Sequence, residues 1–375
     1  MLIKKVFIVV LILAFLSFPV NSLDENDISA RSAVVIDGET GTVLYDKNMS
    51  EQRSMASTTK IMTAILAIES GKLGCTVTAT KNIVSEGTSI GIEKGDCFTL
   101  ETLVWAVLLE SGNDAAVLIS EYLAGTETDF AVLMNLKATE IGMVNTNFVT
   151  ASGLDADGHY STAHDMAILA SYAVKNPIFR RICSTEQYSA SYITPEITET
   201  YTNHNKLLKM YGGVFGVKTG FTKKSGRCLV SACERNGTTL IAVTLNAPDD
   251  WNDHIKLYDY CFGLSVCSNI DIELPEHIKV YGAECEWLEL TCDDISTSTI
   301  NYDSVSYLIL LPQFTYAPIS EGDCIGKIVL LVDGKKYKEI TLKAKTDIVS
   351  TEGGNDLNYT FIYKLKNIFK QTTKG

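Results

Sequence analysis

The chain has 375 residues, of which 46% are hydrophobic and 21% charged, a composition typical of one or two globular domains and not of a disordered protein. Its formal net charge is −13, and the body of the chain has no basic patch, so nucleic acid is not an expected partner.

The first 22 residues have the pattern of a secretory signal peptide. Lys4 and Lys5 precede an apolar stretch over residues 6–20, and Ser22 supplies a small residue near the expected cleavage site. The apolar stretch is shorter than the ~20 residues that a membrane span needs, which favours cleavage over an uncleaved anchor. We therefore expect an exported protein that works on the extracytoplasmic face of the cell membrane.

Residues 23–265 combine helices and strands in an order that predicts one α+β domain. Segments 33–37 and 42–46 predict an N-terminal hairpin, and three later strands predict a meander at residues 213–219, 227–233 and 239–245. The helices expected in this part of the chain cover residues 102–109, 114–123, 129–140 and 251–261, with another from Thr162. Residues 177–211 are expected to be irregular. Because helices fill the middle, the hairpin and the meander are expected to join in one antiparallel sheet.

The ten cysteines are an even number in a chain with an export signal, which permits disulfide bonds. They contain no Cys-x-x-Cys pair, so a zinc ribbon is not expected. Cys75 and Cys97 each begin a strand-like segment. An antiparallel pairing of these segments predicts a disulfide between the two cysteines.

Ser57 and Lys60 form a Ser-x-x-Lys pattern at the start of a helix predicted from about residue 56. Residues three apart share a helix face, with Cβ atoms ~5–6 Å apart, so the amine would lie beside the hydroxyl. The helix N-terminus favours negative charge developing near the serine. The apolar residues 61–68 predict that this helix is buried. An N-cap serine followed by a solvated lysine gives the same pattern, so other motifs must decide between the two interpretations.

Two further motifs follow in the chain. Ser111 and Asn113 form a Ser-x-Asn pattern at the corner between two predicted helices, and Lys-Thr-Gly occupies residues 218–220 at the end of a predicted strand. Ser-x-x-Lys, Ser-x-Asn and Lys-Thr-Gly in this order are the signature of class A β-lactamases and penicillin-binding proteins. Together they favour a catalytic interpretation of Ser57.

The residues around these motifs resemble the low-molecular-mass penicillin-binding proteins that act as serine-type D-alanyl-D-alanine carboxypeptidases. The resemblance covers roughly residues 30–263 and is carried by segments 56–64, 111–116, 153–158 and 216–222. It implies a DD-peptidase/β-lactamase-like fold that needs no metal or cofactor. It also implies a peptidoglycan pentapeptide ending in D-Ala-D-Ala as substrate and β-lactams as inhibitors.

The resemblance implies a role for each nucleophilic or basic residue. Ser57 would attack the substrate carbonyl and become the acyl ester, but a hydroxyl is a weak nucleophile and needs a base. Lys60 would be that base if burial and a neighbouring cation lower its pKa from the usual 10.4. Ser111 would relay the proton to the leaving amine, and Asn113 would hold Lys60 and a substrate amide.

The remaining implied roles concern substrate binding. Lys218 and Thr219 would bind the terminal carboxylate, with Gly220 in the same triplet. The backbone N–H groups of Ser57 and Phe221 would form the oxyanion hole. Phe221 stands where some relatives have His, but only its N–H is needed.

His204 lies where some relatives carry Arg near the site. The sequence leaves two interpretations of it open: a contact with the substrate, or a residue that caps a turn.

Other enzyme classes fit the chain less well. A Ser-His-Asp hydrolase would be expected to carry Gly-x-Ser-x-Gly, which is absent. A class A β-lactamase would need a Glu that activates the deacylating water, and no Glu-x-x-Leu-Asn follows Ser111. A DD-endopeptidase and a non-catalytic protein that binds peptidoglycan or penicillin remain as alternatives, although the intact motif residues argue against the latter.

Residues 266–350 alternate apolar and polar side chains, which predicts a small, all-β, β-sandwich-like domain. Its clearest hairpin joins segments 325–332 and 337–342 through Asp333 and Gly334. Members of the family often carry such a domain and an amphipathic anchor after it.

A polar linker begins at residue 351 and leads to a basic amphipathic tail. Leu357, Phe361, Leu365 and Ile368 form a helical apolar stripe, and the tail carries lysines at 364, 366, 370 and 374. Such a helix suits an anionic membrane surface, and docking on the chain's own β domain is the alternative.

Overall fold

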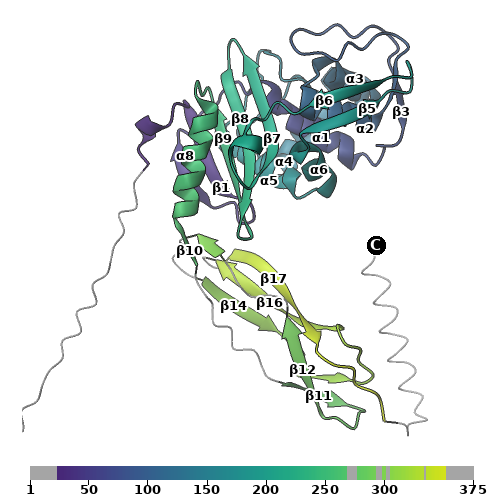
Figure 1. The fold of residues 1–375 in the computed structure, drawn as a ribbon, viewed down its shortest axis with the longest axis vertical. Helices are drawn as coiled ribbons and strands as arrows, with labels where there is room; N and C mark the ends of the chain where they lie inside the picture. Colours follow the sequence, from purple (N-terminus) through teal and green to yellow (C-terminus); the bar gives the residue numbers. More distant parts are fainter. Residues whose placement is uncertain (1–22, 268–276, 293–297, 301–304, 333–334, 352–375) are drawn as a thin grey trace, which may run out of the picture. The chain divides into compact units, whose positions relative to one another are not determined.

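The computed structural model describes residues 23–267, 277–292, 298–300, 305–332 and 335–351 (Figure 1). The chain divides into two compact units, Met1–Val266 and Cys267–Gly375, one residue from the expected boundary. The expected signal peptide and C-terminal helix lie outside the described residues. Within those residues, no helix combines the length and apolarity that a membrane crossing requires.

A five-stranded antiparallel sheet organises the first unit, in the order β2-β1-β9-β8-β7. Its strands are β1 (Ser32–Asp37), β2 (Val43–Lys47), β7 (Val214–Thr222), β8 (Gly226–Arg235) and β9 (Thr238–Leu245). The N-terminal hairpin thus pairs with the C-terminal meander through β1 and β9, as expected. Strand β7, which carries the Lys-Thr-Gly triplet, ends the strand order.

Helices cover both faces of this sheet. Helix α8 (Asp250–Gly263) packs on β8 and β9 from one side, and α5 (Ala163–Val174) packs on β1, β8 and β9 from the other (Figure 1). All six residues of β1 are buried as a result. The same unit also contains η1 (Glu25–Asp27), α2 (Leu100–Trp105), α3 (Asn113–Ala124) and α4 (Glu127–Glu140).

Helix α1 (Lys60–Glu69) is the central helix, and it is buried as its apolar sequence predicts. It packs against α2, α3, α5 and α6 (Pro177–Ser184), so few of its side chains reach solvent. A 3-10 turn, η2 (Ala56–Thr59), precedes it. The helical axis therefore starts three residues later than Ser57, and the serine lies on the turn.

Residues 177–211 are not irregular, and that expectation was wrong. They form α6 (Pro177–Ser184), α7 (Leu207–Met210) and a hairpin of β5 (Gln187–Ser191) with β6 (Thr198–Thr202). Pro177 reads as a breaker in sequence, but a proline at the first helical position loses no hydrogen bond. Asn176 caps α6, because its Oδ1 accepts the N–H of Ile178 at 2.9 Å.

The predicted disulfide between Cys75 and Cys97 is also wrong, since both thiols are free. Strands β3 (Thr76–Thr78) and β4 (Cys97–Thr99) do pair antiparallel. Cys97 lies opposite Thr78, however, and Cys75 lies beyond the other end of the ladder, where its carbonyl accepts the N–H of Leu100. Two residues that each begin an antiparallel strand are far apart, and a disulfide requires Cα atoms within about 7 Å.

The described part of the second unit is all-β, as expected. Six strands pair in the order β14-β16-β17-β12-β11-β15, and β10 pairs separately with β13. The strands of this unit are β11 (His277–Tyr281), β12 (Trp287–Cys292), β13 (Ser298–Ile300), β14 (Val305–Leu310), β15 (Phe314–Tyr316), β16 (Cys324–Val332) and β17 (Lys335–Ala344), and β10 (Ser265–Cys267) spans the boundary between the units. Strands β16 and β17 pair as the predicted hairpin.

Candidate active site

A cavity of about 440 Å³ lies beside the end of β7, and its wall collects residues from motifs far apart in the chain. The expected site residues that line it are Ser57, Ser111, Asn113, His204, Thr219, Gly220 and Phe221. The other two, Lys60 and Lys218, are 0% and 1% exposed. The fold therefore assembles every residue that the sequence predicted for the site.

Ser57 is presented to the cavity by a tight turn of backbone. Ala56, just before it, has φ of +49°, a left-handed conformation that a residue with a side chain rarely adopts. Gly153 packs so closely on this turn that a Cβ there would lie 1.9 Å from the Ala56 carbonyl oxygen. On the other side, a Cβ on Gly220 would lie 3.0 Å from the Ser57 nitrogen. Two glycines thus allow neighbouring segments to hold the serine from both sides.

The side-chain nitrogen of Lys60 contacts three oxygen atoms. It lies 2.9 Å from Ser57 Oγ, 2.6 Å from Asn113 Oδ1 and 2.6 Å from the Ser152 carbonyl oxygen. The Asn113 amide is oriented by its Nδ2, which donates to the Glu86 carbonyl at 2.6 Å. A neutral amine has two N–H groups and one lone pair, and the two carbonyl oxygens can only accept. Both N–H groups are thereby committed, and the lone pair is left for the Ser57 hydroxyl.

The surroundings of Lys60 favour this neutral amine. Complete burial lowers its pKa well below the ordinary value, and the positive charge of Lys218 lowers it further. The negative charge of Asp114 opposes the shift only in part. A lysine with such a pKa is an effective proton acceptor near neutral pH.

Ser111 and Asn113 stand at a corner of the helical layer. Helix α2 runs into a π-helical turn, η3 (Ala106–Glu110), and Ser111 ends that turn with φ of +63°. Asn113 then begins α3, as the sequence predicted for a break at this point. Irregular helical turns of this kind are frequent at functional sites, because they turn side chains away from the regular helix face.

Asp114 fixes the loop that borders this corner. It is 0% exposed. Its carboxylate accepts hydrogen bonds of 2.6–3.1 Å from Ser89 Oγ and from the N–H groups of Ile90, Gly91 and Ile92. The neighbouring Asn113 N–H donates to the Thr88 carbonyl at 2.8 Å. The loop and the start of α3 are therefore locked together.

Lys218 lies behind the cavity wall on β7. Its Nζ donates to the Thr219 carbonyl at 3.0 Å. Burial lowers its pKa to about 7, and the carboxylate of Glu110 limits that decrease. A carboxylate bound in the cavity would stabilise the ammonium form, because opposite charges at short range favour ionisation.

The end of β7 supplies the other wall. Thr219, Gly220 and Phe221 line the cavity, and the Phe221 ring is 65% exposed. A ring so exposed has little packing role. The close approach of Gly220 to the Ser57 nitrogen brings the backbone N–H groups of Ser57 and Phe221 onto adjoining segments, as an oxyanion hole requires.

His204 lines the cavity, and its Nε2 lies 3.7 Å from Glu110 Oε2. Its pKa is lowered by burial and by Lys218, and Glu110 partly offsets this. Glu110 also accepts a hydrogen bond from the N–H of Thr202. It therefore joins the helical corner to the β6 end and lies near both Lys218 and His204.

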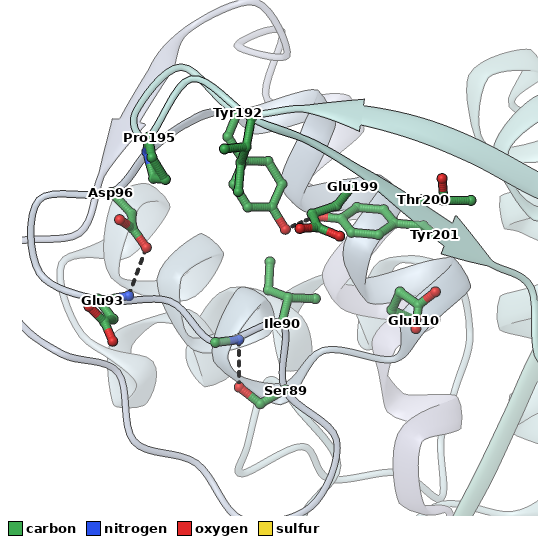
Figure 2. A pocket seen from close by; sticks show the side chains of 12 residues that line it. Ser89, Ile90, Glu93, Asp96, Glu110, Tyr192, Pro195, Glu199, Thr200 and Tyr201 are labelled. Carbon is green, nitrogen blue, oxygen red and sulfur yellow. Dashed lines mark hydrogen bonds between the residues drawn. The ribbon is translucent and has the colours of Figure 1, made fainter.

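Glu110 also lines a second cavity of about 390 Å³, on the side of the loop that precedes β4 (Figure 2). Figure 2 shows the hydroxyl groups of Tyr192 and Tyr201 meeting at its wall, 2.9 Å apart. Glu93, Asp96 and Glu199 add further carboxylates to this wall. Glu110 thus lies between this acidic cavity and the part of the candidate active site that contains Lys218 and His204.

Sequence reasoning missed several residues that build the site. Ser152 contributes only its carbonyl oxygen, which any residue type would supply, so no side-chain pattern marks it. Glu110 and Asp114 flank the Ser-x-Asn motif, and their position beside it was the available signal. Gly153 was noted within a turn-rich loop, but its packing on Ala56 depends on the fold.

Known proteins match this chain over most of its length. A family model described as D-alanyl-D-alanine carboxypeptidase matches residues 19–249. D-alanyl-D-alanine carboxypeptidase DacF of Bacillus subtilis is 32% identical over 336 residues, which cover 85% of this chain and 86% of the relative.

Solved structures of penicillin-binding proteins also match this chain. Penicillin-binding protein 5 of Haemophilus influenzae is 25% identical with a TM-score of 0.60, covering 88% of this chain and 100% of that one. Penicillin-binding protein D2 of Listeria monocytogenes, in its ampicillin-bound form, is 29% identical with a TM-score of 0.56, covering 62% and 97%. The chain therefore belongs to the D-alanyl-D-alanine carboxypeptidase family of penicillin-binding proteins.

Proposed function

We propose that this protein is a serine D-Ala-D-Ala carboxypeptidase that removes the terminal D-alanine of peptidoglycan stem peptides through an acyl ester on Ser57. The observation that carries the proposal is the buried amine of Lys60, whose two carbonyl partners leave its lone pair for the Ser57 hydroxyl. Family membership supports the same reaction.

In the acylation step, Ser57 Oγ attacks the carbonyl carbon between the two D-alanines while Lys60 takes the hydroxyl proton. The oxyanion that forms is stabilised by the N–H groups of Ser57 and Phe221. The C–N bond then breaks, and the proton held by Lys60 passes through the Ser111 hydroxyl to the leaving nitrogen. D-alanine departs with a neutral amine, and Lys60 is again free of the proton. Asn113 holds Lys60 in place throughout.

The terminal carboxylate explains why the enzyme would be an exopeptidase. Lys218 supplies a buried positive charge behind the cavity wall, and Thr219 supplies a hydroxyl on that wall. A free carboxylate at the chain end satisfies this charge, whereas an internal peptide bond does not. Water then enters the cavity and hydrolyses the acyl ester.

Benzylpenicillin tests the reaction class. The proposal expects a covalent adduct on Ser57 that decays slowly, together with D-alanine release from pentapeptide. Rapid adduct turnover would favour a β-lactamase, and cleavage of cross-linked peptides without pentapeptide hydrolysis would favour an endopeptidase. An absent adduct with no released D-alanine would favour the non-catalytic alternative.

The same proposal includes export and a membrane tether. The pattern of residues 1–22 supports cleavage after translocation. The basic amphipathic tail at 357–375 supports attachment to the extracytoplasmic face of the membrane. Deleting residues 357–375 should release the mature protein from membranes. If the protein stays bound, the N-terminal segment is the anchor instead.

A further inference from the structure

Four large aromatic side chains share one exposed face of the second unit. Tyr281, Trp287, Phe314 and Tyr316 are 45%, 52%, 44% and 40% exposed. They lie on three neighbouring strands, β12, β11 and β15. We call this set the aromatic face.

The strand register places these residues on one side of the sheet. Within β11, Ile278 and Val280 are buried, so Lys279 and Tyr281 point to the opposite face. Lys279 pairs with Trp287 on β12 and with Phe314 on β15. Tyr281 pairs in turn with Tyr316. Four exposed aromatic side chains gathered on one side of a sheet are typical of an interaction surface.

The angles between the rings indicate which kind of partner the aromatic face fits. Phe314 meets Tyr281 at an interplanar angle of 87° and Tyr316 at 88°. Rings at right angles present edges as well as faces, so they do not form the flat platform on which a sugar ring stacks. Tyr281 and Tyr316 are tilted by 42° to each other. Tyr and Trp side chains, which have an apolar body and a polar tip, suit an interface that is apolar on one side and wet on the other.

One lysine contacts a ring of this face, and a second lies in an ion pair nearby. The Lys279 amine lies 5.1 Å from the centre of the Tyr281 ring. Lys345, directly after β17, pairs with Glu289 of β12 at 2.7 Å, and both side chains are more than half exposed. Lysines beside interfacial aromatics can reach the phosphates of anionic lipids.

The chain leaves the described structure at the aromatic face. The N–H of Thr351 donates to the carbonyl of Gly282 at 3.1 Å, and Gly282 directly follows Tyr281. The apolar stripe of the tail begins at Leu357, and the residues between span at most ~20 Å. A tail bound to a bilayer would therefore hold this face within a short distance of the same surface.

We propose that the aromatic face is a second membrane contact, which places its Tyr and Trp rings in the interface of an anionic lipid bilayer next to the C-terminal tail. The inference rests on the proposed tether, because the tail supplies the proximity. Aromatic rings concentrate at this depth because they bury apolar area while their polar atoms stay hydrated. Two contacts joined by a short linker bind more tightly than either alone.

Fluorescence quenching tests the contact. Residues 23–375 with a C-terminal polyhistidine tag are mixed with vesicles of phosphatidylcholine and phosphatidylglycerol that contain a lipid brominated near its headgroup. The three tryptophans are Trp105, which is 4% exposed, Trp251 and Trp287. Subtracting the Trp287→Phe signal isolates Trp287, whose emission should be quenched and shifted to shorter wavelength.

A variant pair tests the energetics. Tyr281→Ser with Phe314→Ser should lower vesicle affinity by about tenfold, because apolar area leaves the interface. Leu308→Ser with Leu310→Ser is the matched control, since both leucines are about half exposed on β14, at the other end of the strand order. That control should change the affinity by less than about twofold. Equal losses in both pairs would contradict a specific role for the face.

Adding a nickel-chelating lipid separates this inference from the tether. If the tail has no membrane affinity, binding will depend on nickel, and Trp287 quenching in that bound state would still support the face. An unquenched Trp287 in bound protein overturns the proposal. Burial of Trp287 without lipid quenching would mean that the tail docks on the face, and this also overturns it. Quenching by added glycan strands, but not by lipid, would assign the face to sugar.

Discussion

The side-chain nitrogen of Lys60 lies 2.9 Å from the hydroxyl oxygen of Ser57, and Lys60 is completely buried. Burial makes the ammonium form unfavourable, and the two carbonyl partners of the amine fix the direction of its lone pair. The pair is therefore set for proton transfer before any substrate arrives.

Replacing Lys60 separates its charge from its basicity. Lys60→Ala and Lys60→Arg should each slow acylation by penicillin by about 10³-fold, because neither side chain can accept a proton from Ser57. Labelling with a fluorescent penicillin measures the rate, and circular dichroism checks that the fold persists. Lys72→Ala, which changes an exposed lysine, is the control. Normal labelling of the Lys60→Ala variant would show that another group is the base.

The pH dependence of kcat/KM should be bell-shaped. Activity rises with pH as Lys60 loses its proton, and it falls through about 7 as Lys218 loses the charge that binds the substrate carboxylate. Lys218→Arg keeps a positive charge at all these pH values, so the falling limb should move to higher pH. An unmoved limb in this variant would mean that Lys218 does not set it.

The charge of Glu110 should affect the pH at which kcat/KM falls on the high-pH side of the profile. Its carboxylate limits the decrease in the pKa of Lys218, so Glu110→Gln should move the falling limb to lower pH. The glutamine keeps an oxygen that can accept the Thr202 N–H, and the fold should hold. Glu101→Gln, which removes the charge from an exposed ion pair with Arg181, is the control and should leave the profile unchanged. The same shift in both variants would point to a general charge effect.

Gly153→Ala should disrupt the site or the fold. Its Cβ would lie 1.9 Å from the Ala56 carbonyl oxygen, so the turn that presents Ser57 must move. Gly142→Ala isolates the backbone cost, because Gly142 also has positive φ but nothing within 4 Å of its added Cβ. The control should lose about 1 kcal/mol of unfolding free energy, with penicillin labelling intact. Thermal unfolding and labelling rates compare the two, and equal behaviour would contradict the close packing on Ala56.

Acid should destabilise the protein below about pH 6.5. The pKa of the buried His159 is lowered to about 4, because its burial disfavours the charged ring. The unfolded chain therefore takes up this proton first, and stability falls with pH between about 6.5 and 4. His164, which is partly exposed, serves as the comparison. Urea unfolding across this range measures the effect. His159→Gln should reduce the slope without abolishing it, because the buried His254, whose pKa burial lowers to about 3, contributes over the same range. An unchanged slope would contradict the assignment to His159.

Local sequence patterns were enough to predict most of the candidate site and most strands of the sheet. The three motifs combine a few residue types at fixed spacing. Short apolar runs bounded by turn residues predicted β1, β8 and β9, because strands buried on both faces are almost continuously apolar. The two predictions that were wrong, the disulfide and the irregular segment 177–211, depended on strand register and on helix capping. The sequence predicted the two strand segments that Cys75 and Cys97 begin, but not that the antiparallel register places the two cysteines at opposite ends of the ladder. Pro177 begins a helix because Asn176 caps it. The position of Glu110 in the site depends on its contact with Thr202 of β6, which lies far away in the sequence and so leaves no local pattern.

The most direct test of the account is D-alanine release from an N-acylated peptide ending in D-Ala-D-Ala, measured with the mature protein and its Ser57→Ala variant. The account predicts release by the unmodified protein and none by Ser57→Ala, with Ser54→Ala retaining activity as the control. Release that continues without Ser57, or its absence in the unmodified protein together with no penicillin adduct, would contradict the central claim.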